Sequence, residues 1–228
     1  MDARFLTGDA IRTDGDNAWL AAHANRYGDL YTASWYEHLA INGRIFVSNG
    51  GTGTTPVTFG AGSIDTTEPD IDIQGANTIV VLPLYIAFQM ETFGTNALFE
   101  GMASSGLGGV QGTTTTQLTP RNLRTDNPYA SLATVWTATD GSGSTYMTTN
   151  IAEFWRFGIE AVATVGTGDD DSNRWGAQWI WQRETSQMRP VLRASATLNP
   201  RAVAFAGSQA GTGFVSLGHA ELPSDMIG

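Results

Sequence analysis

TIVVLPLYIAFQME, residues 78–91, is the longest apolar run of the chain and indicates its type of fold. Its first half is rich in β-branched residues, and in its second half large apolar side chains occur at every second position from Ile86 to Met90. This alternation is typical of a strand, because successive side chains point to opposite faces of a sheet. Pro83 has no N–H to give to a neighbouring strand, so we expect a β-bulge or a sheet edge there.

Shorter stretches of the same kind fill most of the chain from residue 30 onward, and turn residues separate them. SNGGTGTTP, residues 48–56, contains Asn-Gly, and both residues tolerate positive φ, so we expect a turn between two strands there. Further strands are predicted at residues 30–36, 44–48, 56–60, 96–105, 131–139, 145–149, 175–185, 190–196, 201–209 and 213–222. No long amphipathic helix separates them, so about ten or eleven antiparallel strands predict an all-β sandwich or barrel.

Three segments depart from this pattern. Residues 1–29 carry scattered Asp and Arg without a period of two, which predicts an extended N-terminal arm before a β-sandwich domain at 30–228. Residues 105–128 are rich in Gly, Thr and Pro, which predicts a long loop, and long loops are usually functional or disordered. Residues 151–166 permit a helix in their first half and favour a strand in their second, and the sequence leaves both open.

Composition narrows the classes of partner. Only 15% of the residues are charged, the net charge is -10, and all twelve basic residues are Arg, because the chain has no Lys. An acidic chain is repelled by phosphate backbones, so we expect no nucleic-acid partner. We also expect no membrane partner, since the chain has neither a basic stretch nor a run of about 18 apolar residues. The absence of Lys and Cys excludes P-loops, Schiff bases, thiol nucleophiles and disulfides.

Patterns typical of catalysis are few. Neither G-x-S-x-G nor H-E-x-x-H occurs, and the histidines His23, His38 and His219 are scattered. Acidic groups at residues 65–72 and 169–171 offer carboxylates suited to glycan hydrolysis or to a hard cation such as Ca²⁺, but acidic loops are more often simply solvated. We therefore expect no enzymatic activity, no cofactor and no bound metal.

The aromatic residues suggest buried contact surfaces. Trp175, Trp179 and Trp181 recur at a spacing of two, so they share one face of the predicted strand at 175–185. Exposed aromatic faces stack on sugars, whereas a shared face favours packing in a core or at a subunit interface. An interface also fits the low charge content, because interface cores are depleted of charged residues.

A polar arm, many short strands joined by Gly/Thr loops, and the closing stretch AFAGSQAGTGFVSLGHAELPSD, residues 204–225, together resemble a known class. The chain resembles the jelly-roll structural proteins of bacterial viruses, which are capsid, cement (decoration) and fibre-head proteins. The phrases RIFVS…TPVTFG at 44–60 and GTGF…AELP at 211–223 carry this resemblance. It implies a virion protein that forms homotrimers and cements or decorates the capsid on its outer surface, where an acidic body is tolerated.

The resemblance also implies where contacts lie. An arm at 1–29 would reach neighbouring coat subunits, and the body would contact copies of itself and the capsid protein. The residues that we expect to make these contacts are Arg4, Phe5, Trp19, Trp175 and Trp179. Three alternatives stay open: a receptor- or glycan-binding fibre or spike head using loop 105–128 and exposed tryptophans, a jelly-roll coat protein, and a sandwich-fold glycan hydrolase or lyase.

Overall fold

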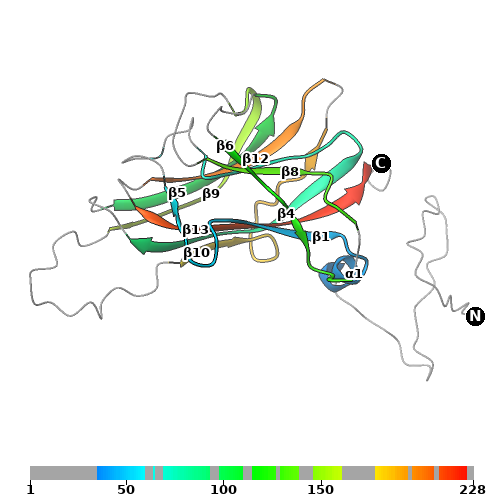
Figure 1. Cartoon of the computed structure of the whole chain (residues 1–228). Coiled ribbons are helices and arrows are strands. Elements are labelled where there is room, and N and C mark those ends of the chain that lie inside the picture. Colours follow the sequence, from blue (N-terminus) through cyan, green and yellow to red (C-terminus); the bar gives the residue numbers. More distant parts are fainter. Residues whose placement is uncertain are drawn as a thin grey trace, which may run out of the picture.

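The protein forms two layers of antiparallel strands packed face to face, with one short helix at one end (Figure 1). This computed structural model describes residues 35–59, 64, 69–92, 98–109, 115–126, 129–138, 146–160, 178–194, 197–207 and 211–224. The arm predicted for residues 1–29 lies outside this range. The all-β sandwich predicted from the sequence is confirmed. The one helix in the described residues is neither long nor apolar enough to cross a membrane.

The first sheet has the strand order β10-β4-β13-β1-β7, and two short strands extend it, because β11 also pairs with β4 and β2 with β13. Its strands are β1 (Ile45–Gly50), β2 (Val57–Thr58), β4 (Ile79–Thr92), β7 (Arg121–Asn122), β10 (Gln178–Gln182), β11 (Leu192–Arg193) and β13 (Thr212–Pro223). The run quoted above is therefore the central strand β4, flanked by β13 on one side and by β10 and β11 on the other.

The second sheet has the strand order β6-β8-β3-β12-β5-β9. Its strands are β3 (Ile71–Gln74), β5 (Leu98–Leu107), β6 (Thr115–Leu118), β8 (Thr134–Ala138), β9 (Thr149–Glu160) and β12 (Pro200–Gly207). The ambiguous segment at 151–166 is thus a strand as far as Glu160, and its remainder lies outside the described residues.

The pairing of eight principal strands shows how the chain is rolled up. In chain order these strands are β1, β3, β4, β5, β9, β10, β12 and β13. The first pairs with the eighth, the second with the seventh, the third with the sixth and the fourth with the fifth. The nested pairs join edge to edge through β13–β4 in one sheet and β12–β5 in the other. This is the topology of a jelly roll, a double-sheet fold of two Greek keys.

Strands β6, β7 and β8 form an insertion between the fourth and fifth principal strands. β6 and β7 lie where a long loop was predicted at 105–128, whereas β8 is the strand predicted at 131–139. β8 and β6 extend the second sheet beyond β3, while β7 extends the first sheet beyond β1. The insertion therefore wraps one edge of the sandwich. The strand predicted at 145–149 is wrong at residues 146–148, which are not in a strand, and Thr149 already belongs to β9. The Thr148 N–H donates to the Leu107 carbonyl at 2.9 Å.

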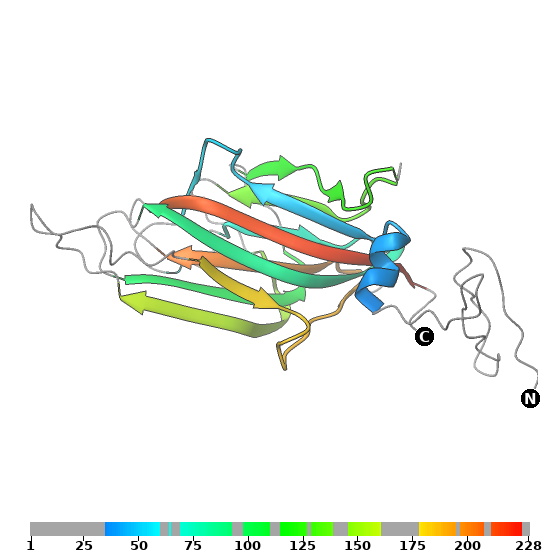
Figure 2. The ribbon, with the colours of Figure 1, turned by 90° about the horizontal axis from the view of Figure 1, so that it is seen from below.

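The strand predicted at 30–36 is wrong at its described end, because residues 35–41 form the helix α1 (Trp35–Ile41). α1 lies across one end of β1, β13 and β4 on the outer face of the first sheet (Figure 2). Its Leu39 is buried against residues of those strands, and Tyr36 packs beside it. The aromatic residues that suggested a strand pack here from a helix, because burial on the sheet overrides local strand preference.

The main core fills the space between the two sheets. It consists largely of inward side chains of β4 and β13 from the first sheet and of β3, β5 and β12 from the second. The inward residues of β12 are small, namely Ala202, Ala204 and Ala206, and they leave room for the large rings opposite. A second, smaller cluster lies under α1, and a third covers the outer face of β12, where Met147 and Tyr146 pack on Val203 and Phe205.

Two predictions about backbone irregularities can be compared with the structure. Gly218 pairs with Tyr85 and His219 with Pro83, so Leu84 is an extra residue and the predicted bulge at Pro83 is confirmed. The turn predicted within 48–56 is also present, with Thr52 and Thr55 bonded to each other. It begins later than expected, however, because β1 extends through the Asn-Gly pair and Gly51 adopts a φ of 92°.

Candidate functional site

The contact residues predicted from the sequence fall mostly outside the described range. Those outside it are Arg4, Phe5, Trp19 and Trp175. Trp179, which is described, packs inward from β10: its ring stacks on Phe157 with centroids 5.1 Å apart and lies 4.7 Å from Phe99. Trp181 is buried on the same face. Core packing, one of the two uses expected for these rings, is therefore what the described residues show.

Exposed apolar side chains gather where α1, the end of β7 and the insertion meet. They are Ile41, Leu123, Tyr129 and Leu132, and we call them the insertion patch. Contacts near Arg44 and Arg124 place them close together. Glu221 donates its N–H to the Arg44 carbonyl and accepts from the Leu132 N–H, and Arg124 donates to the Ile41 carbonyl. The Arg44 guanidinium lies 5.7 Å from the centre of the Tyr129 ring, and the Leu123 N–H donates to the carbonyl of Ile45. The patch is the kind of exposed apolar surface that marks a contact with another protein.

The insertion is fastened to β13 by a buried carboxylate, and we call this contact the Glu221 anchor. Glu221 accepts hydrogen bonds from Ser131 Oγ and from the backbone N–H groups of Leu132 (3.1 Å) and Ala133 (3.0 Å). His219 Nε2 is 3.3 Å from the same carboxylate. Burial would raise the pKa of Glu221, but the hydrogen bonds from His219, Ser131, Ala133 and Leu132 hold it below its ordinary value.

Ser131, His219 and Glu221 are the residue types of a catalytic triad, but their geometry differs from one. His219 is fully buried, its Nδ1 has no partner, and its Nε2 faces both Ser131 Oγ (3.3 Å) and Glu221. A proton on Nε2 satisfies this arrangement, because the orphaned Nδ1 is then only an acceptor. With the proton assigned to Nε2, Ser131 donates to the carboxylate and His219 is not placed to accept the serine proton. The contacts of these three residues fasten the insertion to β13.

A second buried carboxylate lies on the outer face of the second sheet, and we call it the Asp72 anchor. Arg201 donates from Nη1 to Asp72 Oδ2 and from Nη2 to Gln74 Oε1 (2.7 Å). The Arg201 guanidinium also lies 5.8 Å from the ring centre of Trp136 on the insertion strand β8. Asp72 Oδ1 and Arg201 Nε have no partner. Burial raises the pKa of Asp72 to about 7, although the charge of Arg201 opposes this.

The acidic groups predicted as possible carboxylate sites are only partly described. Asp70 and Asp72 are both buried, and Asp70 accepts a hydrogen bond from the Ala206 N–H. Asp65, Glu68 and residues 169–171 lie outside the described residues. Within the described part of the chain, no three His, Asp or Glu side chains come together as they would around a metal ion.

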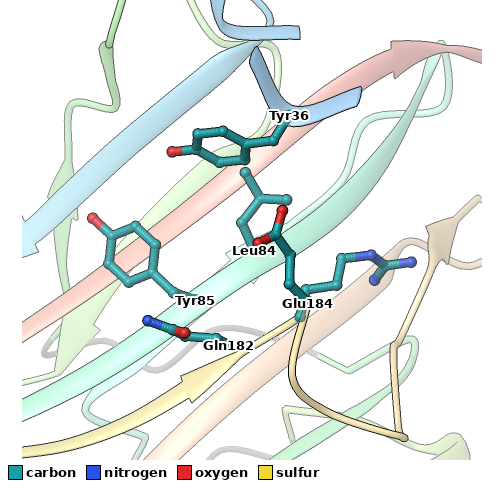
Figure 3. A pocket seen from close by; sticks show the side chains of 6 residues that line it. Tyr36, Leu84, Tyr85, Gln182 and Glu184 are labelled. Atoms are coloured by element: carbon teal, nitrogen blue, oxygen red, sulfur yellow. The ribbon is translucent and has the colours of Figure 1, made fainter. Parts of the chain in front are cut away.

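A pocket of about 190 Å³ opens on the outer face of the first sheet, between α1 and the end of β10 (Figure 3). It is lined by Tyr36, Leu84, Tyr85, Gln182, Arg183 and Glu184. The β4 bulge creates it, because the extra residue turns Leu84 and Tyr85 toward the same face. Tyr36 reaches the pocket from α1, while Gln182 ends β10 and the next two residues form the rim.

The side chains of the pocket combine aromatic surface with hydrogen-bonding groups. Burial, and to a lesser extent Tyr36, raises the pKa of Tyr85, so its hydroxyl is neutral near pH 7. Burial, and then Arg189, lowers the pKa of Arg183. The Arg183 guanidinium donates to the Pro190 carbonyl at 2.6 Å, so its charged end is engaged by the following turn. The pocket suits a small ligand with an apolar face and several polar groups.

Sequence reasoning missed this pocket and both anchors. His219 and Glu221 stand two apart in a predicted strand, a spacing that places both on one face, and this was the available signal. Their partner Ser131 is 88 to 90 residues away. Tyr36 and Tyr85 are brought together by a helix and a bulge, and neither is visible as a sequence motif.

Comparison with known proteins does not assign the chain to a family. No family model, no curated protein and no solved structure matches it.

Proposed function

We propose that this protein is a structural component of a virus particle, which self-associates as a trimer and decorates or cements the outer surface of a capsid. The observation that carries the proposal is the nested pairing of eight strands into a jelly roll. Viral capsid subunits are one of the main groups of proteins with this architecture, along with lectins and cupins. Because one fold hosts many functions, the proposed role also needs support from the surface of the protein.

The insertion patch supplies that support. It presents four apolar side chains at the edge where the insertion wraps the sandwich, and Leu132 and Tyr129 within it are 58% and 64% exposed. A chain with a net charge of -10 and only 15% charged residues relies on such surfaces when it packs against copies of itself. The same negative charge favours the outside of a shell over a lining that faces a genome.

The proposal is tested with empty shells of the virus that encodes the chain. The purified protein should have the mass of a trimer by light scattering, should sediment with the shells, and should raise their melting temperature. Leu132→Asp should weaken both associations, because it places a charge in the patch. Ile151→Asp is the matched control, since Ile151 is also 58% exposed but lies on β9. A monomeric protein that stays in the supernatant would contradict the proposal.

A further inference from the structure

The pocket at the β4 bulge has a chemistry that the proposed shell role does not use. We propose that it binds one sugar residue of a neutral glycan, with the sugar ring lying against Tyr36 or Tyr85 and its hydroxyls bonded at the rim. This site does not rest on the shell role. It also differs from the glycan-binding residues expected from the sequence, which were the loop at 105–128 and exposed tryptophans.

The aromatic surface is the first argument. Tyr36 and Tyr85 come from different elements, and Figure 3 shows their rings near one another at one side of the pocket, with Leu84 between α1 and the sheet. The Tyr36 ring is in edge contact with the exposed Trp35, at 6.5 Å between centroids, so the aromatic surface continues outside the pocket. Such faces suit the apolar C–H face of a sugar ring.

The rim groups are the second argument. A sugar hydroxyl both donates and accepts hydrogen bonds, so its site needs groups of both kinds. The Gln182 amide provides both, the Tyr85 hydroxyl stays neutral and provides both, and the Glu184 carboxylate accepts. The Arg183 guanidinium donates to the Pro190 carbonyl and keeps its positive charge, so Arg183 and Glu184 give the lining one formal charge of each sign. These charges sum to zero, so the lining has no net charge that would select an ionic ligand, and a neutral one fits.

One of the two tyrosine rings, that of Tyr85, is fixed before any ligand arrives. Tyr85 lies over Gly218 of the neighbouring strand, and a Cβ at that position would stand 2.2 Å from Tyr85 Cε1. Only glycine at 218 lets the ring lie so close to the sheet. A ring held in this way loses little freedom on binding. At about 190 Å³ the pocket is smaller than drug-sized sites of roughly 300–1,000 Å³, so it accepts one ring-sized group.

The test uses the full chain on an array of defined neutral and acidic glycans, followed by calorimetric titration with the glycan retained best. Tyr36→Ala removes one platform ring and should weaken binding about tenfold or more, and Gln182→Ala should weaken it several-fold, on the order of one lost hydrogen bond. Gln178→Ala is the matched control, because Gln178 is also exposed on β10 but lies outside the pocket. It should leave affinity within about twofold.

Gly218→Ala adds a variant that touches no rim group, and it should weaken binding by displacing the Tyr85 ring. Melting curves of each variant show whether the fold is intact. The proposal is overturned if no neutral glycan is retained, if only acidic glycans bind, or if Tyr36→Ala and Gln182→Ala bind as well as the parent. Retention of choline in place of sugars would also overturn it, since the two rings would then serve a cation. Unchanged binding of Gln182→Ala to shells separates this site from the shell contact.

Discussion

The Glu221 anchor and the Asp72 anchor hold the same insertion, yet they stabilise it in different ways. Glu221 is surrounded by four donors, which are Ser131, Leu132, Ala133 and His219. Asp72 has one charged partner, Arg201, and its second oxygen has none. Both carboxylates are buried. The pKa is nevertheless lowered in the first and raised to about 7 in the second.

The difference shows that burial alone does not set the state of a carboxylate. Desolvation raises the pKa at both anchors, and the outcome depends on how many hydrogen bonds stabilise the charged form. Glu221 has enough donors to remain ionised through the neutral range. Asp72 relies on one ion pair, and such a pair seldom repays the cost of removing two charges from water. The charge of Glu221 therefore stabilises the folded state, whereas ionisation of the buried Asp72 lowers the free energy of unfolding.

The largest effect is expected from Arg201→Met. It leaves the Asp72 carboxylate buried without a counter-charge and removes the contact with Trp136, so the free energy of unfolding should fall by about 3–5 kcal/mol. Urea denaturation measures this. The double variant Asp72→Leu/Arg201→Met removes both charges and should recover most of the loss. If the double variant is as unstable as Arg201→Met, the anchor is not a costly ion pair.

The pH dependence of stability separates the two anchors by sign. Asp72 in the folded state keeps its proton up to about pH 7, while the unfolded chain releases it near 3.8. Between these values the folded state binds more protons, so stability falls as pH rises. This contribution is on the order of 4 kcal/mol across the window, since one pKa unit is about 1.4 kcal/mol. Urea denaturation at pH 4 to 8 should show that Asp72→Asn loses this decline.

Glu221 has the opposite dependence. Its pKa is below the ordinary 4.5, so its contribution is complete above pH 4.5 and is lost as pH falls through the folded-state pKa. At pH 7, Glu221→Gln should cost about 2–3 kcal/mol, because hydrogen bonds to a charged acceptor are worth about that much. The difference from the parent protein should shrink below pH 4.5. A constant difference down to pH 3 would show that charge is not what the anchor uses.

The smallest effect is expected at the surface. Glu153 and Arg156 form an ion pair on β9 at 2.7 Å, with both side chains largely exposed. Glu153→Gln should change the free energy of unfolding by less than about 1 kcal/mol, because exposed pairs are screened by water and salt. The same urea experiment provides the measurement and serves as the control for Glu221→Gln. A loss as large as that of Glu221→Gln would mean that burial does not distinguish the two sites.

The regular strands could be predicted from sequence because their side chains alternate. The patterns at β4, β10 and β13 gave strands near their true positions, and Pro83 marked the bulge. β3 was not among the predicted strands, although Ile71 and Ile73 alternate with Asp72 and Gln74, because it is only four residues long and Pro69 interrupts the pattern just before it. α1 was predicted as a strand, since its aromatic residues favour strands unless a helix can bury them on a neighbouring surface.

The candidate sites could not be predicted to the same extent, because they depend on the rolled topology. Asp72 and Arg201 are 129 residues apart and meet only because β3 pairs with β12. The spacing of tryptophans at 175–181 predicted a shared face, and Trp179 and Trp181 do share it. The same spacing did not indicate whether the face meets the core or a partner, because both environments exclude water and favour aromatic residues.

Pro83 also determines where the protein can accept additional sequence. β10 and β11 pair with β4 on either side of Pro83, and between them the chain leaves the sheet. Pro83 has no N–H that a strand at this edge could bond. The excursion is closed by its own arginines: Arg189 donates to the carbonyls of Glu184 and Ser186, and Arg183 to that of Pro190. A peptide tag placed at its exposed tip would be displayed on the surface, while the central strand keeps its hydrogen bonds.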